Sequence, residues 1–246
     1  MASRAEILRE LHLAPEWRLR RGAIVAGQDA GAPVEGAPAP AQTATTRLER
    51  IATLGWDEFA ADVAACTACC LCRTRNLVVP GVGDIRAQWM LIGEAPGAEE
   101  DARGEPFVGQ AGKLLDNMLA ALGMNRRENV YIANVLKCRP PGNRTPAPAE
   151  VDACRPYLER QIALIQPRLI LALGKSAASL LLGTDASIAS LRGRVHRCRG
   201  VPLVVTYHPA YLLRSLHEKA KAWEDLLLAR RTVGACLYET DPVANE

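Results

Sequence analysis

The sequence is poor in aromatic residues, has no long apolar run and carries little net charge. Only 4% of its 246 residues are Phe, Trp or Tyr, so an aromatic side chain beside a motif is a stronger signal than usual. No apolar run reaches the roughly 18 to 20 residues that span a bilayer, so we expect no association with a membrane. A formal net charge of +3 is too small to drive nucleic-acid binding through the field of the whole molecule. Such binding would need a local basic patch.

The N-terminus also lacks the features of a secretory signal. Residues 1–6 contain neither an apolar core nor a small-residue cleavage site, and we therefore expect a cytoplasmic protein. The cytosol keeps thiols reduced, so the eight cysteines of the sequence are expected to ligate a metal or a cluster and not to form disulfides.

Composition divides the chain into three parts. Residues 22–46 are rich in Ala, Gly and Pro and are predicted to form a flexible linker. Together with a short amphipathic helix predicted over residues 3–12, they form an N-terminal extension, residues 1–50, which we interpret as a tethered docking segment for a protein partner. Residues 51–235 form the core domain, expected to be monomeric, and residues 236–246 form a C-terminal tail.

In the core domain, short apolar runs alternate with amphipathic segments. Strands are predicted over residues 89–92, 129–135, 169–173 and 203–206, with a hairpin strand within residues 192–199. Helices are predicted from residue 56 to the first cysteines, over residues 110–122 and 148–165, from residue 175, and over residues 218–231. This alternation predicts an α/β fold of three layers, in which helices cover both faces of a mainly parallel sheet.

Glu94 follows the first of these strands, in the turn Gly93-Glu94-Ala95-Pro96-Gly97. Ligand sites in open α/β sheets lie beyond the carboxyl ends of the strands, and the two glycines allow the backbone to approach a ligand closely. The turn therefore marks a candidate site, although a tight turn that carries a solvated carboxylate would have the same sequence.

Four cysteines form a set that is split across the chain: Cys66, Cys69, Cys138 and Cys154. Four convergent thiolates hold either zinc or a [4Fe-4S] cluster, and the long separation of Cys138 from Cys154 argues against a zinc ribbon. Cys69 and Cys72 have the same spacing as Cys66 and Cys69, so spacing leaves the first pair open. Cys198 and Cys236 are isolated, and we interpret them as small apolar residues.

From about residue 56 to residue 231 the chain closely resembles the family 4 uracil-DNA glycosylases, the iron–sulfur type. The resemblance rests on several motifs in order: the Gly93–Gly97 turn with Glu99-Glu100-Asp101, Pro106-Phe107-Val108-Gly109, Tyr131-Ile132-Ala133-Asn134-Val135, Lys137-Cys138-Arg139-Pro140-Pro141, Asn143-Arg144-Thr145-Pro146, and His208-Pro209-Ala210-Tyr211-Leu212-Leu213. The N-terminal fifty residues lie outside the resemblance.

The resemblance implies a four-stranded parallel sheet flanked by helices. It also implies excision of uracil from single- or double-stranded DNA, as in base excision repair. It also implies a [4Fe-4S] cluster on Cys66, Cys69, Cys138 and Cys154, because the family's knuckle is Cys-Thr-Ala-Cys-Pro. In this chain Cys70 stands in place of that proline.

Uracil excision assigns roles to further residues. A flipped uracil is expected to stack on Phe107 and to pair through N3–H and O4 with the amide of Asn134. Negative charge then develops on the departing base, and His208 is expected to donate a hydrogen bond to its O2 atom. Backbone N–H groups of the Glu94–Gly97 turn would assist, and Ala95 and Pro96 of this turn are expected to line the uracil site.

Glu94 has two possible functions in this reaction. The carboxylate would either orient the attacking water or stabilise the cationic sugar, and we therefore name Glu94 and His208 as the catalytic residues.

DNA contacts are expected from local basic groups and from a wedge that follows His208. The basic groups are Arg139, Arg144, Arg194 and Arg214, and the wedge residues are Tyr211, Leu212 and Leu213. Burial of the wedge residues under the last helix is the alternative interpretation.

Two other functions account for part of the sequence. A sister group captures uracil covalently through a histidine in the loop after the Asn-bearing strand, but residues 138–146 contain no histidine. A non-catalytic iron–sulfur or zinc module that binds nucleic acid would explain the cysteines and arginines. It would not explain the joint presence of Glu94, Phe107, Asn134 and His208.

Overall fold

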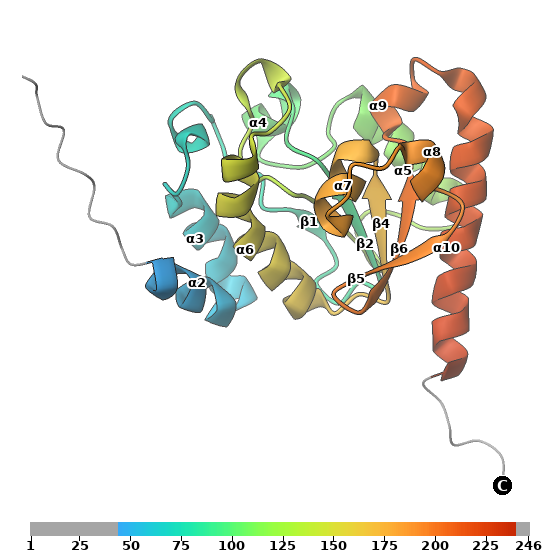
Figure 1. Cartoon of the computed structure of the whole chain (residues 1–246), viewed down its shortest axis with the longest axis horizontal. Helices are drawn as coiled ribbons and strands as arrows, with labels where there is room; N and C mark the ends of the chain where they lie inside the picture. Colours follow the sequence, from blue (N-terminus) through green and yellow to red (C-terminus); the bar gives the residue numbers. More distant parts are fainter. Residues whose placement is uncertain (1–43, 240–246) are drawn as a thin grey trace, which may run out of the picture. The chain divides into compact units, whose positions relative to one another are not determined.

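The computed structural model describes residues 44–239, with side chains from residue 47 to residue 235 (Figure 1). Its centre is a six-stranded sheet in the order β1-β3-β2-β4-β6-β5. The strands are β1 (Val82–Gly83), β2 (Trp89–Gly93), β3 (Val130–Asn134), β4 (Leu169–Leu173), β5 (Val195–Cys198) and β6 (Val201–Thr206). The four central strands run parallel, and β1 and β5 pair antiparallel at the two edges.

The four predicted core strands and the hairpin strand are confirmed, and β1 is an addition. Residues 80–84 have the composition of a turn, because β1 needs glycine where most strands need a bulky side chain. A Cβ atom on Gly83, whose φ is +128°, would lie 2.2 Å from the carbonyl oxygen of Val130. The close approach to β3 therefore removes the usual sequence signal of a strand.

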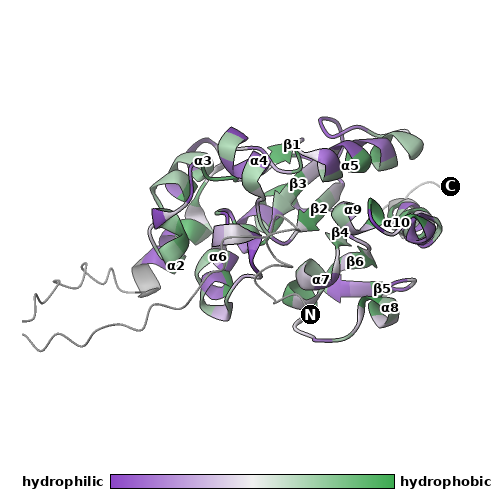
Figure 2. Ribbon diagram, turned by 90° about the horizontal axis from the view of Figure 1, so that it is seen from above, coloured by the Kyte–Doolittle hydropathy of each residue, from purple (hydrophilic) through white to green (hydrophobic). Residues whose placement is uncertain are grey.

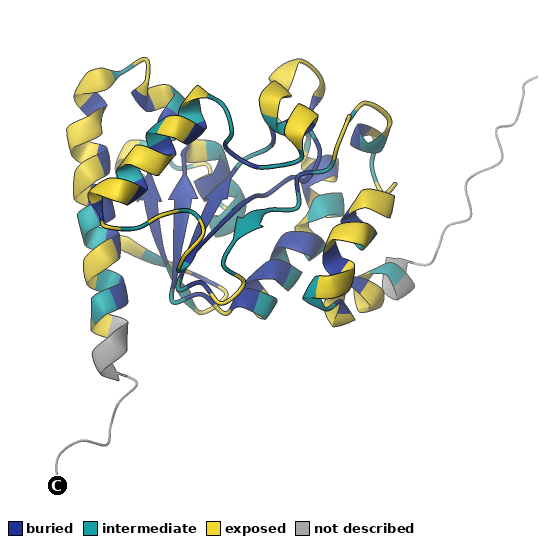
Figure 3. Cartoon of the chain, turned by 180° about the vertical axis from the view of Figure 1, so that it is seen from behind, coloured by how far each residue is buried: buried dark blue, intermediate teal, exposed yellow. Residues whose placement is uncertain are grey.

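Side chains of the central strands point alternately to two apolar layers. Met90 and Ile92 join a cluster with residues of α6 (Pro148–Ile165) and α7 (Lys175–Leu182), whereas Leu91 joins residues of α5 (Gln110–Ala121) and α10 (Lys219–Glu239). Figure 2 shows the strands between these two sets of helices. Every residue of β2, β3 and β4 is buried, as the dark strands of Figure 3 show. The three-layer α/β prediction is confirmed.

The helices predicted in the core domain are present with nearly the expected bounds, except that α10 continues to Glu239, eight residues beyond the predicted end. The structure adds short helices in connections where the sequence showed no periodicity, because one or two turns are too short to display it. These are α4 (Ala98–Arg103), α8 (Ile188–Leu191) and α9 (Pro209–Leu212).

The expected domain boundary at residue 50 falls inside a helix of the core, α2 (Ala44–Thr53). The Arg47 guanidinium donates a hydrogen bond to the carbonyl of Ala153 in α6 at 2.8 Å, and Ile51 packs in one cluster with Tyr157 of α6 and with Phe59 of α3 (Trp56–Ala65). The core therefore begins before residue 50, because α2 covers an apolar face of α6. At the other end, α10 continues past residue 235.

Several predictions for the two ends of the chain lie outside the described residues. These are the helix over residues 3–12, most of the linker and the last seven residues of the tail. Between residues 44 and 239, no helix combines the length and the apolar character that a membrane crossing requires.

Candidate active site and cysteine cavity

A cavity of about 510 Å³ lies at the carboxyl ends of the parallel strands. Three strands each deliver one expected residue to its lining: Glu94 follows β2, Asn134 ends β3 and His208 follows β6 by two residues. The other residues expected at the uracil site, Ala95, Pro96 and Phe107, line the same cavity. The structure thus brings all six expected uracil-site residues together.

Glu94 is half-buried, and its Oε1 atom is buried without a hydrogen-bond partner among the described residues. Burial raises the pKa of the Glu94 carboxyl, and Ser176 of α7 acts in the opposite direction. The Glu94 carboxyl lines the cavity and has a buried oxygen whose hydrogen-bonding capacity is unused among the described residues.

Asn134 is buried beside Gly93, its register partner on β2. A Cβ atom on Gly93 would lie 2.4 Å from the Asn134 Oδ1 atom and 2.8 Å from the Cζ atom of Phe107. Glycine at this position therefore allows the amide and the aromatic ring to approach the same wall of the cavity. The Lys137 ammonium donates a hydrogen bond to the backbone carbonyl of Asn134 at 2.7 Å.

His208 is held in one protonation state by its surroundings. Its Nδ1 atom accepts a hydrogen bond from the backbone N–H of Ala210 at 3.1 Å, so in the neutral ring the proton lies on Nε2. Burial and then the charge of Arg214 lower the pKa of His208 to about 4. At neutral pH the side chain is therefore an uncharged hydrogen-bond donor through Nε2.

Phe107 stacks on His208, with ring centroids 5.5 Å apart and an interplanar angle of 29°. Its backbone has a φ of +55°, in the left-handed region that aromatic residues rarely adopt. A Cβ atom on Gly112 of α5 would lie 1.7 Å from the Phe107 carbonyl oxygen, so this loop conformation requires glycine there.

A second, smaller cavity is lined by the four expected cysteine ligands, Cys66, Cys69, Cys138 and Cys154. Cys72 lines it as well, so the structure keeps the alternative ligand in place. Among residues 47–235, no group of three or more His, Cys, Asp or Glu side chains has the arrangement of a single metal-ion site.

Hydrogen-bond donors surround the sulfur atoms of this cavity. The Arg75 guanidinium donates to Cys138 Sγ at 3.1 Å, and the Lys137 backbone N–H donates to Cys154 Sγ at 3.3 Å. The Lys137 side chain is fully buried, and burial lowers its pKa to about 8. Cations and N–H donors around four thiols suit a ligand set that is anionic when it holds iron.

The sequence profile of a family described as the uracil DNA glycosylase superfamily matches residues 80–227. Over 165 residues the chain is 45% identical to a type-4 uracil-DNA glycosylase of Archaeoglobus fulgidus, a match that covers 64% of this chain and 82% of that relative. The chain belongs to the type-4 uracil-DNA glycosylases.

The chain is also similar to two further relatives, one of type 4 and one of type 5. A type-4 uracil-DNA glycosylase of Thermotoga maritima is 48% identical over 155 residues, which are 62% of this chain and 80% of that relative. A type-5 uracil-DNA glycosylase of Pyrobaculum aerophilum is 33% identical over 150 residues, which are 54% of this chain and 66% of that relative.

Of the four arginines expected to contact DNA in this type-4 family member, two line the active-site cavity. Arg144 and Arg214 line it, and Arg139 lies in the adjoining loop, where its Nε donates to Asn143 Oδ1 at 2.7 Å. Arg194 is exposed just before β5, whose first residue pairs with Val204 of β6.

Leu212 is not available as a wedge, so that prediction is wrong. Its side chain is 1% exposed and packs with Tyr207 and Ala222, because the turn of α9 directs it inward. Tyr211, at 37% exposure, stacks on Tyr207 with centroids 5.2 Å apart. Leu213, at 42% exposure, is the apolar side chain of this segment that the fold leaves at the surface.

Sequence reasoning assigned no role to Glu100, which lines the active-site cavity. Its Oε2 accepts a hydrogen bond from the Gly97 N–H at 3.1 Å, and its Oε1 accepts one from the Val108 N–H at 3.0 Å. One carboxylate therefore joins the Glu94 turn to the Phe107 loop. Glu three residues after a helix N-cap is the pattern of a capping box, and this signal was present in the sequence.

Glu150, in the first turn of α6, was missed as well. It accepts two hydrogen bonds from the Arg144 guanidinium, at 2.5 and 2.8 Å, and the Cys70 thiol lies 3.3 Å from its Oε1. Arg144 lowers the pKa of Glu150 to about 2. Glu150 thus anchors the loop that carries Arg139 and Arg144 beside the cavity.

Proposed function

We propose that this protein excises uracil from DNA by hydrolysing the N-glycosidic bond of a flipped deoxyuridine, leaving an abasic site. The observation that carries the proposal is the meeting of Glu94, Phe107, Asn134 and His208 in one cavity at the strand ends. Membership of the uracil-DNA glycosylases supports this function over a non-catalytic nucleic-acid-binding module.

Phe107 and Asn134 are proposed to capture the base. Extruding a nucleotide from a duplex costs a few kcal/mol, and stacking on one aromatic ring returns about 1–3 kcal/mol. A bidentate contact of the amide with uracil N3–H and O4 contributes about 1–3 kcal/mol more. The two side chains together offset the cost of extrusion.

His208 is proposed to stabilise the departing base. Its uncharged ring donates from Nε2 toward the uracil O2 atom, where negative charge grows as the glycosidic bond breaks. The Ala210 N–H supports this role because it occupies Nδ1 and fixes the tautomer before substrate binds.

Glu94 is proposed to act on the sugar side of the glycosidic bond, whereas His208 acts on the base. The Glu94 carboxyl lines the cavity, where it can accept a hydrogen bond from the attacking water, and its charge also favours the cationic sugar.

Cys66, Cys69, Cys138 and Cys154 are proposed to hold a [4Fe-4S] cluster. The donor set fits this group, because the four thiols line one cavity and because cysteines around a four-iron cluster lie farther apart than ligands of one ion. When bound, the cluster supplies a covalent link between the segment around residues 66–69 and the segments that carry Cys138 and Cys154.

The cluster is tested by analysis of anaerobically purified protein. We expect about four irons and four acid-labile sulfides per chain. Cys154→Ser should lose them, whereas Cys198→Ser, which alters a buried cysteine outside the cavity, should keep them. Loss of iron in Cys72→Ser with retention in Cys66→Ser would reassign the first pair to Cys69 and Cys72.

Excision is tested with an oligonucleotide that contains one uracil, followed by alkaline cleavage of abasic sites. We expect cleavage at the uracil position and no cleavage when thymine occupies it. His208→Ala, prepared in parallel, controls for contaminating glycosylases. Absence of free uracil from the wild-type reaction would contradict the proposed function.

The cytoplasmic location, the monomeric state and a protein partner for the N-terminal segment remain predictions from the sequence. Gel filtration of the purified full-length chain tests the monomeric state directly.

A further inference from the structure

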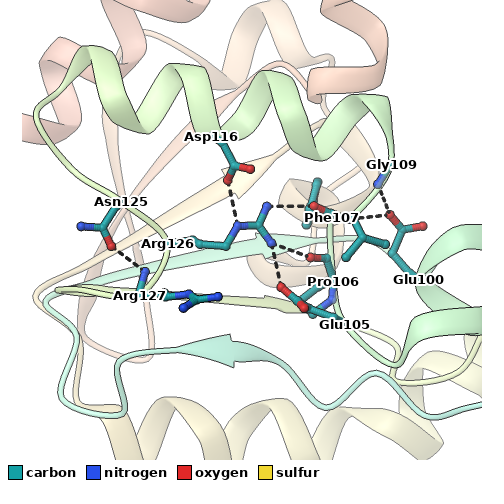
Figure 4. Close-up of polar contacts among 10 residues, drawn as sticks. Glu100, Glu105, Pro106, Phe107, Gly109, Asp116, Asn125, Arg126 and Arg127 are labelled. Carbon is teal, nitrogen blue, oxygen red and sulfur yellow. Dashed lines mark hydrogen bonds and ion pairs between the residues drawn. The ribbon is translucent and has the colours of Figure 1, made fainter.

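Arg126 lies between α5 and β3 and does not line the active-site cavity, yet it contacts the loop that carries Phe107 (Figure 4). Its side chain is only 16% exposed. The guanidinium donates to the Asp116 carboxylate through Nε at 2.8 Å and to the Glu105 carboxylate through Nη1 at 3.1 Å. The two acids, one on α5 and one in the loop, fix the plane of the guanidinium.

The remaining donors of Arg126 reach two consecutive backbone carbonyls. Nη1 donates to the Pro106 carbonyl at 3.3 Å, and Nη2 donates to the Phe107 carbonyl at 2.8 Å. These two carbonyl groups lie at the two ends of the φ torsion of Phe107. A planar fork that binds both carbonyls therefore restrains that torsion directly.

The restrained torsion is the one that needs support. With a φ of +55°, Phe107 occupies a region that a bulky aromatic residue adopts only when its surroundings hold it there. Gly112 leaves room for the Phe107 carbonyl, and Arg126 binds that carbonyl. Rotation of φ toward the ordinary negative region would swing the ring away from His208.

We propose that Arg126 is a positioning residue for base capture, which holds Phe107 in the backbone conformation that presents its ring to the flipped base. This inference rests on the proposed role of Phe107 in uracil excision. Arg126 acts through two carbonyls and touches neither the base nor the scissile bond.

The chain offers a matched control in the adjacent residue. Arg127 is exposed, and its backbone N–H donates a hydrogen bond to Asn125 Oδ1 at 2.9 Å. Arg126→Gln and Arg127→Gln therefore make the same change of charge and size one residue apart. Arg126→Lys keeps the charge and removes the planar fork.

The first measurement is the single-turnover rate of uracil excision. Because misplacing a contact by about 1 Å costs up to about a hundredfold, we expect Arg126→Gln to lower the rate on a U·A duplex about tenfold or more. The loss should be smaller on single-stranded DNA, where extrusion is easier. In a Phe107→Ala background, Arg126→Gln should cause no further loss. Arg127→Gln should leave the rate of its parent protein unchanged in either background.

The second measurement does not depend on excision. The Phe107 ring lies 5.5 Å from the His208 ring, so its ring current shifts the NMR signals of the imidazole protons. Arg126→Gln should move these signals toward their positions in Phe107→Ala, and Arg127→Gln should leave them in place. Arg126→Lys should move the His208 signals in the same direction. It replaces Arg126→Gln in both measurements if Arg126→Gln does not fold.

The two measurements separate the inference from the proposed function. Movement of the His208 signals in a protein that excises no uracil would support the restraint of Phe107 by Arg126 and would remove the proposed function. Unchanged signals together with a wild-type rate on the U·A duplex would overturn the inference. A loss of rate in the Phe107→Ala background as large as in the wild-type background would overturn it as well.

Discussion

At the residue scale, His208 combines a fixed tautomer with an uncharged ring. We predict that His208→Ala lowers the single-turnover rate of uracil excision by about 10²-fold or more, the usual cost of removing a donor to a developing oxyanion. Binding of uracil-containing DNA should change little, because the donor acts mainly as charge develops. Titration of a fluorescent duplex measures the second quantity. A full single-turnover rate in the variant would remove His208 from the mechanism.

The depressed pKa of His208 also predicts how stability depends on pH. Burial lowers the pKa from 6.5 to about 4 in the folded protein, so between these values the unfolded chain binds the proton more readily. The free energy of unfolding should therefore fall as pH decreases from about 6.5 to 4, by up to about 3 kcal/mol from this residue. His208→Gln should flatten that part of the profile. Denaturant unfolding of both proteins across this pH range makes the comparison.

Some site residues could be predicted from the sequence, and others could not. Glu94 and Asn134 stand at the ends of apolar runs, where the fold class alone places ligand sites. Arg126 has no such signal, because its partners are backbone carbonyls whose positions depend on the path of a loop. Leu212 was predicted wrongly for a related reason: a single helical turn decides which of three consecutive side chains points inward.

At the element scale, Glu150 links the first turn of α6 to the loop that borders the cavity. We predict that Glu150→Gln weakens DNA binding severalfold and lowers stability by about 1–3 kcal/mol, since it leaves Arg144 without a charged partner. Asp152→Asn, on an exposed side chain of the same helix, is the matched control. Equal effects of the two substitutions on DNA affinity would show that Glu150 does not position the loop.

The elements themselves were predictable where they are long or fully buried. The four parallel strands are continuous apolar runs, and the helices α5 and α6 have periodic apolar residues over several turns. β1 and α4 have no such signal in the sequence, because each is short. The close approach of Gly83 to β3 defines β1, and the hydrogen bonds of Glu100 to two loops hold α4 in place. Missing β1 did not change the predicted fold, whereas missing α4 left the role of Glu100 at the site unpredicted.

At the scale of the whole molecule, α2 decides how much of the N-terminus can be removed. We predict that deletion of residues 1–43 leaves uracil excision within a few-fold of the full chain, because their composition is that of a tether. Deletion of residues 1–50 should lower the unfolding midpoint as well, because it removes Arg47 and most of α2 from the surface of α6. Thermal unfolding and excision assays on both truncations test this. Equal midpoints for the two would mean that α2 adds no stability.

The strand order has a consequence for how activity arises during synthesis. Glu94 and Asn134 stand on adjacent strands, β2 and β3, but His208 follows β6, which joins the sheet only through β4. A nascent chain that lacks β6 therefore lacks the donor for the leaving base, although it already contains the amide and the carboxylate. Because a domain folds as a unit, the capacity to cut glycosidic bonds arises only after the last strand of the parallel set has been made.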